Sequence, residues 1–361
     1  MKPSAQTFDE ERRRMFYAKT DLPLPDAELQ ALRQKSDAEL GLTRERLLDL
    51  VETHGGPVLD LGPLAQQGTF HRLFRLRFAL NPQEVHVLRV PVLGQAHGLA
   101  IDAWAHQEAW FEDAGGLQGV ETIGEYGAQL AGELLPLAPG TCLATHDADD
   151  AFMDKALQSV GKKLAILHAL PGQKYGPLAV NSLETQETHG LHDHWRDYLA
   201  LNLDAHVQTC LHAGVLQADE AHKVTQLLGL LQKLPNPEPR FLHCDLGSHN
   251  VFVDEDAEVT AFLDWEDVAF GDPLFDLAMT ATFQPARRHA ALFQGYFGGP
   301  LPAKQSVVFS LYFLRIELAK IVHRLRFGYA DKPGRPGNRQ RILAALERLQ
   351  PTSTPTPARQ T

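Results

Sequence analysis

The chain has 361 residues, of which 44% are hydrophobic, and a formal net charge of −11 at pH 7. This length is sufficient for two lobes or domains, each with its own hydrophobic core. The acidic balance argues against a nucleic-acid binder, which normally carries a basic patch or a basic excess. The three cysteines are scattered and odd in number, which indicates reduced thiols. With no apolar signal core at the N-terminus and no apolar run as long as a membrane span, the sequence predicts a cytoplasmic protein that does not enter a membrane.

The first 56 residues are mixed in charge and helical in pattern. Thr43 is placed to cap a helix in which Leu47 and Val51 belong to an apolar stripe, and Gly55-Gly56 is expected to end that helix. We expect residues 1–56 to form a helical extension laid on the first lobe. No residue pattern in this extension indicates chemistry.

From Val58 onward the pattern changes to strands. Residues 61–78 predict a strand, a turn near Gly68, and a second strand that alternates between its two faces. Glycine in such a turn lets backbone N–H groups approach a phosphate, so Gly68 and the adjacent Thr69 are candidate nucleotide-binding residues. An ordinary hairpin turn uses glycine in the same way, and that alternative stays open. The chain has no Gly-x-x-x-x-Gly-Lys-Ser/Thr motif, which argues against a P-loop nucleotide-binding protein.

The strand predicted for residues 84–90 carries Arg89 at the end of an apolar face. The helix that follows places Glu108 on the same face as Ile101, Ala105 and Phe111, so a carboxylate interrupts an apolar stripe. Carboxylates and guanidinium groups are seldom buried without a partner, and we therefore expect Arg89 to pair with Glu108. The alternative is two unrelated surface charges.

The clearest chemical pattern surrounds a predicted β-hairpin. Residues 251–253 and 259–263 read as two antiparallel strands, so Asn250 and Asp264 converge at one open end, and Asp245 lies shortly before in the same loop. Phosphoryl transfer needs a carboxylate that accepts a hydroxyl proton, together with oxygen ligands that hold Mg²⁺ against a triphosphate. Asp245, Asn250 and Asp264 fit that requirement.

The block continues with Gly271-Asp272-Pro273-Leu274-Phe275-Asp276. Together with His243-x-Asp245 and the hairpin, it resembles the aminoglycoside phosphotransferase family of small-molecule kinases more than it resembles eukaryotic protein kinases. The resemblance covers about residues 61–283 in order and motif type. It implies an α+β, two-lobed, protein-kinase-like fold.

The resemblance also implies boundaries and roles. The nucleotide-binding N-lobe would span residues 57–135 and the larger, mainly helical C-lobe residues 136–350, followed by a disordered tail at 351–361. In this family the residue at the Asp245 position is the catalytic base, and those at the Asn250 and Asp264 positions bind Mg²⁺. Arg89, where Lys is usual, would contact the α and β phosphates of ATP while Glu108 braces it.

Further roles follow from the same resemblance. Residues 129–140 resemble the hinge between the lobes, where backbone groups of Glu133 to Leu135 would meet the purine edge. Asp276 would brace the backbone of the catalytic loop, and His243 would organise that loop. Cys244 stands where the family usually has a small residue such as Gly, and we expect the change to be mild because a free Cys behaves as a small hydrophobe. Glu266 would either touch metal or substrate or face solvent.

The partner these features predict is a small molecule with a hydroxyl acceptor, and the fold alone cannot identify it. Choline, a sugar, a ketoamine or homoserine would use the same nucleotide machinery as an aminoglycoside. A protein kinase is disfavoured because no Ala-Pro-Glu segment follows Asp264. A catalytically silent nucleotide-binding protein is the alternative from another class, and the Arg89 replacement keeps it open. The sequence does not indicate an oligomeric state.

Overall fold

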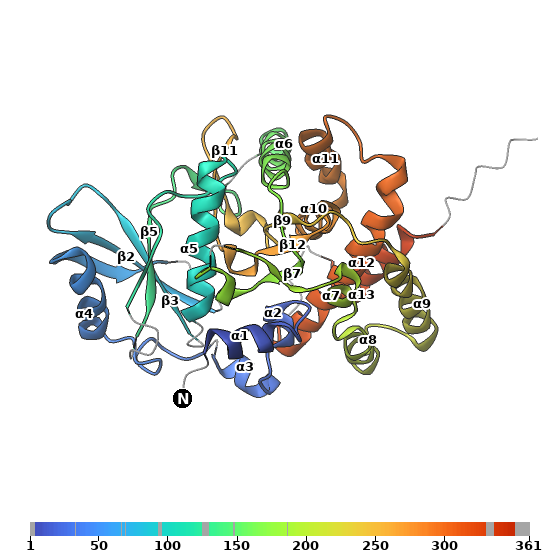
Figure 1. The fold of residues 1–361 in the computed structure, drawn as a ribbon, viewed down its shortest axis with the longest axis horizontal. Helices are drawn as coiled ribbons and strands as arrows, with labels where there is room; N and C mark the ends of the chain where they lie inside the picture. Colours follow the sequence, from blue (N-terminus) through green and yellow to red (C-terminus); the bar gives the residue numbers. More distant parts are fainter. Residues whose placement is uncertain are drawn as a thin grey trace, which may run out of the picture.

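The computed structural model describes residues 4–32, 34–65, 67–68, 70–92, 96–124, 130–146, 149–185, 187–329 and 336–350. The chain forms two lobes, a sheet-rich one and a mainly helical one (Figure 1). The smaller lobe contains a five-stranded antiparallel sheet with the strand order β1-β2-β3-β5-β4. Its strands are β1 (Val58–Pro63), β2 (His71–Phe78), β3 (His86–Pro91), β4 (Glu121–Ile123) and β5 (Gly132–Pro136).

Two helices flank this sheet. Helix α4 (Arg44–Gly55) begins after Thr43, whose side chain accepts the Arg46 N–H, and ends at Gly56, which has a φ of 83°. The predicted helix with its cap and its glycine stop is therefore confirmed. Leu47 and Val51 of α4 join the hydrophobic cluster of the sheet, as their spacing indicates. Helix α5 (Ala96–Phe111) lies between the sheet and the larger lobe (Figure 1).

The larger lobe is built around one continuous hydrophobic core. Two small sheets, β11-β10-β6 and β8-β7-β12-β9, hold the loops that carry the candidate site. The helices of this lobe are α6 (Asp150–Leu167), α7 (Trp195–Ala200), α8 (Leu203–His212), α9 (Ala218–Leu228), α10 (Pro273–Thr282), α11 (His289–Phe297), α12 (Ser306–Arg326) and α13 (Asn338–Glu347). Its strands are β6 (Thr141–Cys142), β7 (Tyr175–Leu178), β8 (Gly190–His192), β9 (Arg240–Leu242), β10 (Val251–Val253), β11 (Val259–Phe262) and β12 (Ala269–Gly271).

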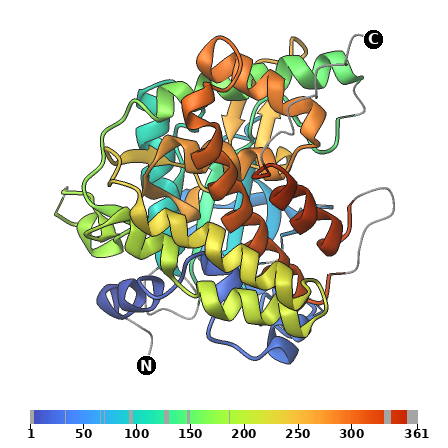
Figure 2. The same cartoon turned by 90° about the vertical axis from the view of Figure 1, so that its right-hand side faces the viewer.

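The first three helices pack on the larger lobe. These are α1 (Ala5–Arg12), α2 (Ala18–Asp21) and α3 (Asp26–Leu32), and they lie along its lower edge in Figure 2. Phe8 and Phe16 belong to the core of the larger lobe, while Leu29 packs against Phe327 just after α12. The expectation that the whole extension lies on the first lobe is therefore wrong for α1–α3 and correct for α4, because these apolar side chains find their partners on different lobes.

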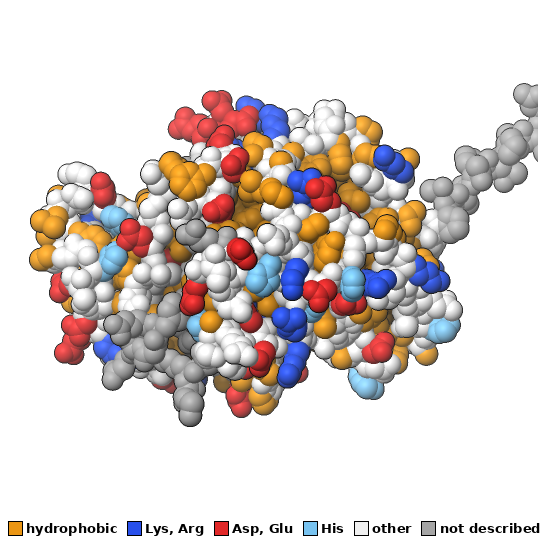
Figure 3. Space-filling view, in the orientation of Figure 1, with side chains coloured by type: hydrophobic (Ala, Val, Ile, Leu, Met, Phe, Trp, Pro, Cys, Tyr) orange, Lys and Arg blue, Asp and Glu red, His pale blue; other side chains and the backbone are white. Residues whose placement is uncertain are grey.

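Acidic, basic and hydrophobic side chains lie next to one another on the face shown in Figure 3. Among the residues described, none of the helices is long and apolar enough to cross a membrane.

Candidate active site

The candidate catalytic loop between β9 and β10 is held by a buried carboxylate. Asp276 of α10 is 0% exposed, and its oxygens accept the backbone N–H groups of His243 at 2.7 Å and Cys244 at 2.9 Å. The Nε2 of His168 lies 3.1 Å from the same carboxylate. Burial raises the pKa of Asp276, but His168 and the hydrogen bonds outweigh it, so the net pKa is lowered. The predicted bracing role of Asp276 is confirmed.

His243 and Cys244 shape the loop in different ways. The Nδ1 of His243 accepts the Asp245 N–H at 3.3 Å, and its Nε2 lies 3.2 Å from the Leu263 carbonyl oxygen, which agrees with a loop organiser. Cys244 has a φ of 65°, in the left-handed region that glycine adopts most easily. A β-carbon in this conformation costs about 1–2 kcal/mol. We expected the change from Gly to Cys to be mild because the Cys side chain is small. The change is costly because the backbone adopts a left-handed conformation at this position.

The three predicted catalytic and metal-binding residues meet at the end of the hairpin. Strands β10 and β11 pair with Val251 opposite Phe262, and the Leu263 N–H donates to the Asn250 carbonyl oxygen at 2.9 Å. This pairing brings Asn250 beside the residue that precedes Asp264, as the hairpin prediction requires. The Nδ2 of Asn250 donates to the Asp245 carbonyl oxygen at 3.0 Å, which leaves its amide oxygen as an acceptor.

The donor set suits a hard cation. The amide oxygen of Asn250 and the carboxylate of Asp264 are ligands that Mg²⁺ prefers. Burial raises the pKa of Asp264, but Lys19 and Arg89 outweigh it and hold that pKa well below its usual value. Asp264 is therefore ionised at neutral pH. The roles of Asp245, Asn250 and Asp264 in catalysis and metal binding remain predictions.

Arg89 lies at the centre of a buried ion network. Its Nη1 lies 2.9 Å from Asp102 Oδ1 and 3.1 Å from Glu133 Oε2, and its Nη2 contacts Asp264 and lies 3.2 Å from Glu266 Oε2. Burial lowers the pKa of Arg89, but the four carboxylates outweigh it and raise that pKa well above its usual value. Arg89 therefore keeps its charge and connects the small lobe to Asp264.

The prediction that Arg89 pairs with Glu108 is wrong. Arg89 pairs instead with Asp102, six residues earlier in α5. Asp102 shares the buried face with Ala105 and Ala109, all 0% exposed, whereas Phe111 of the predicted stripe is 63% exposed. The predicted stripe correctly included Ile101 and Ala105 but was continued to Glu108 and Phe111, so it missed Asp102. Glu108 is half-buried, and burial raises its pKa.

Glu133 and Leu135 lie inside β5 rather than at a free hinge. Leu137 donates its N–H to the Val85 carbonyl oxygen at 3.0 Å, and Leu135 and Glu133 stand opposite Val87 and Arg89. Because hydrogen-bonded pairs alternate in an antiparallel ladder, the backbone groups of both residues point to β3. Their predicted contact with a purine edge does not fit this register. Glu133 contributes its carboxylate to Arg89 instead.

The turn after β1 is described only in part. A β-carbon on Gly68 would lie 3.2 Å from the His71 carbonyl oxygen, so glycine allows the turn to lie close to the start of β2. Thr69 and the tail at 351–361 lie outside the described residues. Phosphate binding by Gly68 and Thr69 remains a prediction.

Two residues of the N-terminal extension reach the site, and the sequence did not indicate them. The Tyr17 hydroxyl donates to Asp245 Oδ1 at 3.0 Å, and the Lys19 ammonium donates to Asp245 Oδ2 at 2.6 Å. Lys19 also lies 3.2 Å from Asp264 and 3.0 Å from Asp267. Burial lowers the pKa of Lys19, but these three carboxylates outweigh it and raise that pKa well above its usual value. No local pattern links positions so distant in sequence.

Glu266 faces the site rather than bulk solvent. Its carboxylate contacts Arg89 and lies 3.3 Å from His71 Nε2 and 3.9 Å from Lys19. Burial and the charge of Asp264 raise the pKa of Glu266 to about 8. His71, Asp264 and Glu266 carry possible ligand atoms within 4.8 Å of one another, but the cations of Arg89 and Lys19 already contact both carboxylates.

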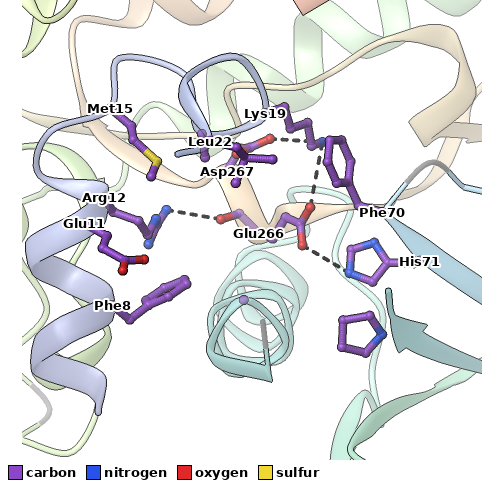
Figure 4. A pocket seen from close by; sticks show the side chains of 13 residues that line it. Phe8, Glu11, Arg12, Met15, Lys19, Leu22, Phe70, His71, Glu266 and Asp267 are labelled. Atoms are coloured by element: carbon purple, nitrogen blue, oxygen red, sulfur yellow. Dashed lines mark hydrogen bonds and ion pairs between the residues drawn. The ribbon is translucent and has the colours of Figure 1, made fainter. Parts of the chain in front are cut away.

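A shallow cleft, open to solvent, leads to this cluster from the side of α1. Figure 4 shows Lys19 reaching toward Asp267 and Glu266, and Glu266 lying across from His71. The lining mixes apolar and charged side chains, namely Phe8, Met15, Leu22 and Phe70 with Glu11, Arg12, Lys19, Glu266 and Asp267.

The sheet-and-helix architecture and the braced loop place the protein among kinase-like phosphotransferases, and comparisons with known proteins agree. Residues 87–307 match the family described as the phosphotransferase enzyme family, and the chain belongs to it. The hygromycin-B 4-O-kinase of Escherichia coli is 28% identical over 170 residues, which are 45% of this chain and 46% of that protein. The match therefore spans about half the length of this curated relative.

Two solved structures show the same fold. A thermostable mutant of aminoglycoside phosphotransferase APH(4)-Ia, in ternary complex with ADP and hygromycin B, aligns over 82% of this chain and 97% of its own with 22% identity and a TM-score of 0.62. Spectinomycin phosphotransferase APH(9)-Ia, in complex with ADP and spectinomycin, aligns over 84% of this chain and 93% of its own, with 13% identity and a TM-score of 0.51. The α+β kinase-like fold expected from the sequence is confirmed.

Proposed function

We propose that the protein transfers the γ-phosphoryl group of ATP to a hydroxyl group of a small molecule with the help of Mg²⁺. The observation that carries this proposal is the meeting of Asp245, Asn250 and Asp264 at one end of the β10–β11 hairpin. The candidate base and a candidate metal ligand are close enough for one ammonium group, that of Lys19, to contact both Asp245 and Asp264. Family membership supports the reaction class.

In this proposal each residue has a distinct task. Asp245 orients the acceptor hydroxyl and takes its proton, while the N–H of Asp245 and the brace of Asp276 keep the loop in place. Asn250 and Asp264 hold Mg²⁺, which supplies positive charge at the phosphate oxygens when it is bound. Arg89 orients Asp264 and contacts the α and β phosphates. Positioning and charge neutralisation then supply most of the rate enhancement.

The acceptor is the open part of the proposal. Hygromycin B is the first compound to test, because a curated relative is named for its phosphorylation. The cleft beside α1 carries Arg12 and Lys19 as well as acids, so it does not favour a polycation over a neutral alcohol. Choline, sugars, ketoamines and homoserine therefore belong in the same panel.

The test is Mg²⁺-dependent ADP formation from ATP across that panel, with mass spectrometry of the acceptor for the added phosphate. Asp245→Asn should abolish acceptor-stimulated turnover, whereas Asp193→Asn, which changes an exposed acid paired with Lys174, should not change it. ATP binding without turnover for any acceptor would favour the silent nucleotide-binding alternative. Turnover that survives in Asp245→Asn would refute the assignment of the base.

A further inference from the structure

The N-terminal segment covers the candidate base from two sides. Asp245 is 4% exposed, and each of its carboxylate oxygens accepts a hydrogen bond from this segment, one from Tyr17 and one from Lys19. The side chain of Lys19 is itself only 13% exposed. An acceptor hydroxyl that reaches Asp245 must therefore lie in contact with this segment.

Lys19 occupies the position through which a transferred phosphoryl group must pass. A base touches the acceptor oxygen, and a metal ion held by Asp264 touches the phosphoryl oxygens, so the phosphorus moves between Asp245 and Asp264. The ammonium lies between these two carboxylates, 2.6 Å from the first and 3.2 Å from the second. A cation at this place is next to the developing charge.

The backbone of the segment is fixed, which argues against a plug that leaves as a unit. His323 of α12 bonds the Lys19 carbonyl oxygen at 3.0 Å, and the Thr20 hydroxyl donates to the Ala319 carbonyl oxygen at 3.2 Å. The guanidinium of Arg326 donates to three carbonyl oxygens of the segment, those of Thr20, Leu22 and Leu24. The side chain of Lys19, with its flexible four-carbon stem, remains able to shift by a few ångströms.

Charge supports a permanent cation at this place. In the described part of the chain, Arg89 and Lys19 are in contact with six carboxyl groups. These acids are Asp102, Glu133, Asp245, Asp264, Glu266 and Asp267. A nucleotide triphosphate adds further negative charge, so loss of Lys19 would leave phosphate oxygens facing Asp245 and Asp264, whose pKa values are lowered, without the ammonium that contacts both.

We propose that residues 17–19 are a permanent part of the phosphoryl-transfer site, with Lys19 as a catalytic cation for the γ-phosphoryl group and Tyr17 as a positioning residue for Asp245. This inference rests on the proposed function. The acceptor oxygen forms a bond to the γ-phosphorus while the bond from that phosphorus to the β,γ-bridging oxygen breaks. The electron pair of that bond leaves with ADP, and the hydroxyl proton passes to Asp245. Lys19 stays protonated and turns from the carboxylates toward the phosphoryl oxygens.

The test compares Lys19→Met, Lys19→Arg and Tyr17→Phe with matched controls. Lys19→Met should lower kcat by about 10²–10³-fold, the usual loss for a donor aimed at developing charge, and change the KM of the acceptor little. Lys19→Arg keeps the charge and should retain more activity than Lys19→Met. Tyr17→Phe should lower kcat less, by about 3–10-fold, the value of one hydrogen bond. Lys223→Met, on the exposed face of α9, and Tyr175→Phe should match the wild type.

A binding readout keeps the inference separate from the proposed function. If Lys19 contacts the γ-phosphate, the wild type should bind a non-hydrolysable ATP analogue more tightly than ADP, and Lys19→Met should lower that preference by about tenfold or more. Calorimetric titration measures both affinities, and thermal unfolding confirms that each variant is folded. If Lys19→Met fails to fold, Lys19→Gln takes its place in the same assays.

The outcomes separate the two ideas. A kcat in Lys19→Met that equals or exceeds that of the wild type would mean that Lys19 is a bystander or an inhibitory plug. An unchanged preference for the triphosphate analogue would overturn the inference as well, even if Asp245→Asn abolishes turnover and the proposed function stands. A lowered preference without turnover on any acceptor would support the role of Lys19 at the γ-phosphate while refuting the proposed reaction.

Discussion

Replacing Arg89 by Met tests whether the buried ion network holds the two lobes together. The side chain of Arg89 is 7% exposed, and those of its partners Asp102 and Glu133 are 0% exposed. Removing one member of a buried ion pair leaves an uncompensated charge, which costs about 3–5 kcal/mol. We therefore expect Arg89→Met to lower the free energy of unfolding by that amount at pH 7, measured by urea titration followed by tryptophan fluorescence.

The matched control is Arg77→Met in the neighbouring strand. The Arg77–Asp60 pair spans 3.4 Å, with side chains 35% and 48% exposed, and such surface pairs contribute about 0–1 kcal/mol. Arg89→Lys should recover only part of the loss, because one ammonium replaces two guanidinium nitrogens that each contact two carboxyl groups.

The effect of pH has a defined sign. Arg89 and Lys19 hold the pKa of Asp264 below its usual value, so Asp264 stabilises the fold above its unfolded pKa, and this contribution is lost as the pH falls through the folded pKa. Arg89→Met weakens this contribution and lets the freed carboxyl groups protonate more easily. The stability gap between wild type and variant should therefore narrow as the pH falls from about 5 toward 2, through and below the unfolded pKa of Asp264. A gap below about 1 kcal/mol at pH 7, or one that widens in acid, would refute the reasoning.

Three further changes test other parts of the structure. Asp276→Asn should lower the free energy of unfolding by about 2–3 kcal/mol and should lower kcat, because the amide group of Asn turns a donor toward one of the two backbone N–H groups that Asp276 accepts. A urea unfolding curve that matches the wild type would contradict the bracing role of Asp276. Burial lowers the pKa of Lys320 to about 7, so the wild type gains stability as the pH rises from 7 to 10.5. Lys320→Met should then be more stable than the wild type by a few kcal/mol at pH 6. The full difference between the folded and unfolded pKa of Lys320 sets an upper limit of about 5 kcal/mol on this gain. Thermal unfolding at a series of pH values should show that the gain disappears above about pH 10. Gly161→Ala would place a β-carbon 2.4 Å from the Leu292 carbonyl oxygen and should lower the free energy of unfolding by about 1–3 kcal/mol. Gly229→Ala, whose β-carbon would have no neighbouring atom within 4 Å, should leave the stability nearly unchanged in the same measurement.

Short-range patterns determined the elements that carry the candidate base and metal ligands. The β-branched runs and the intervening turn predicted the β10–β11 hairpin, and antiparallel pairing alone brought Asn250 close to Asp264. In the same way, Thr43 and Gly55-Gly56 marked the ends of α4. These features depend on hydrogen bonds between residues near one another in sequence, which local composition encodes.

Tertiary structure alone decided which side chains complete the site. Both Asp102 and Glu108 were available on α5, and close packing against the rest of the protein selected the face that carries Asp102. Register in β5 turned Glu133 toward Arg89 and away from a hinge role. Tyr17 and Lys19 reach Asp245 because Phe8 of α1 and Phe16 and Tyr17, just before α2, bury their side chains in the core of the larger lobe. Sequence periodicity does not specify the partner of such side chains.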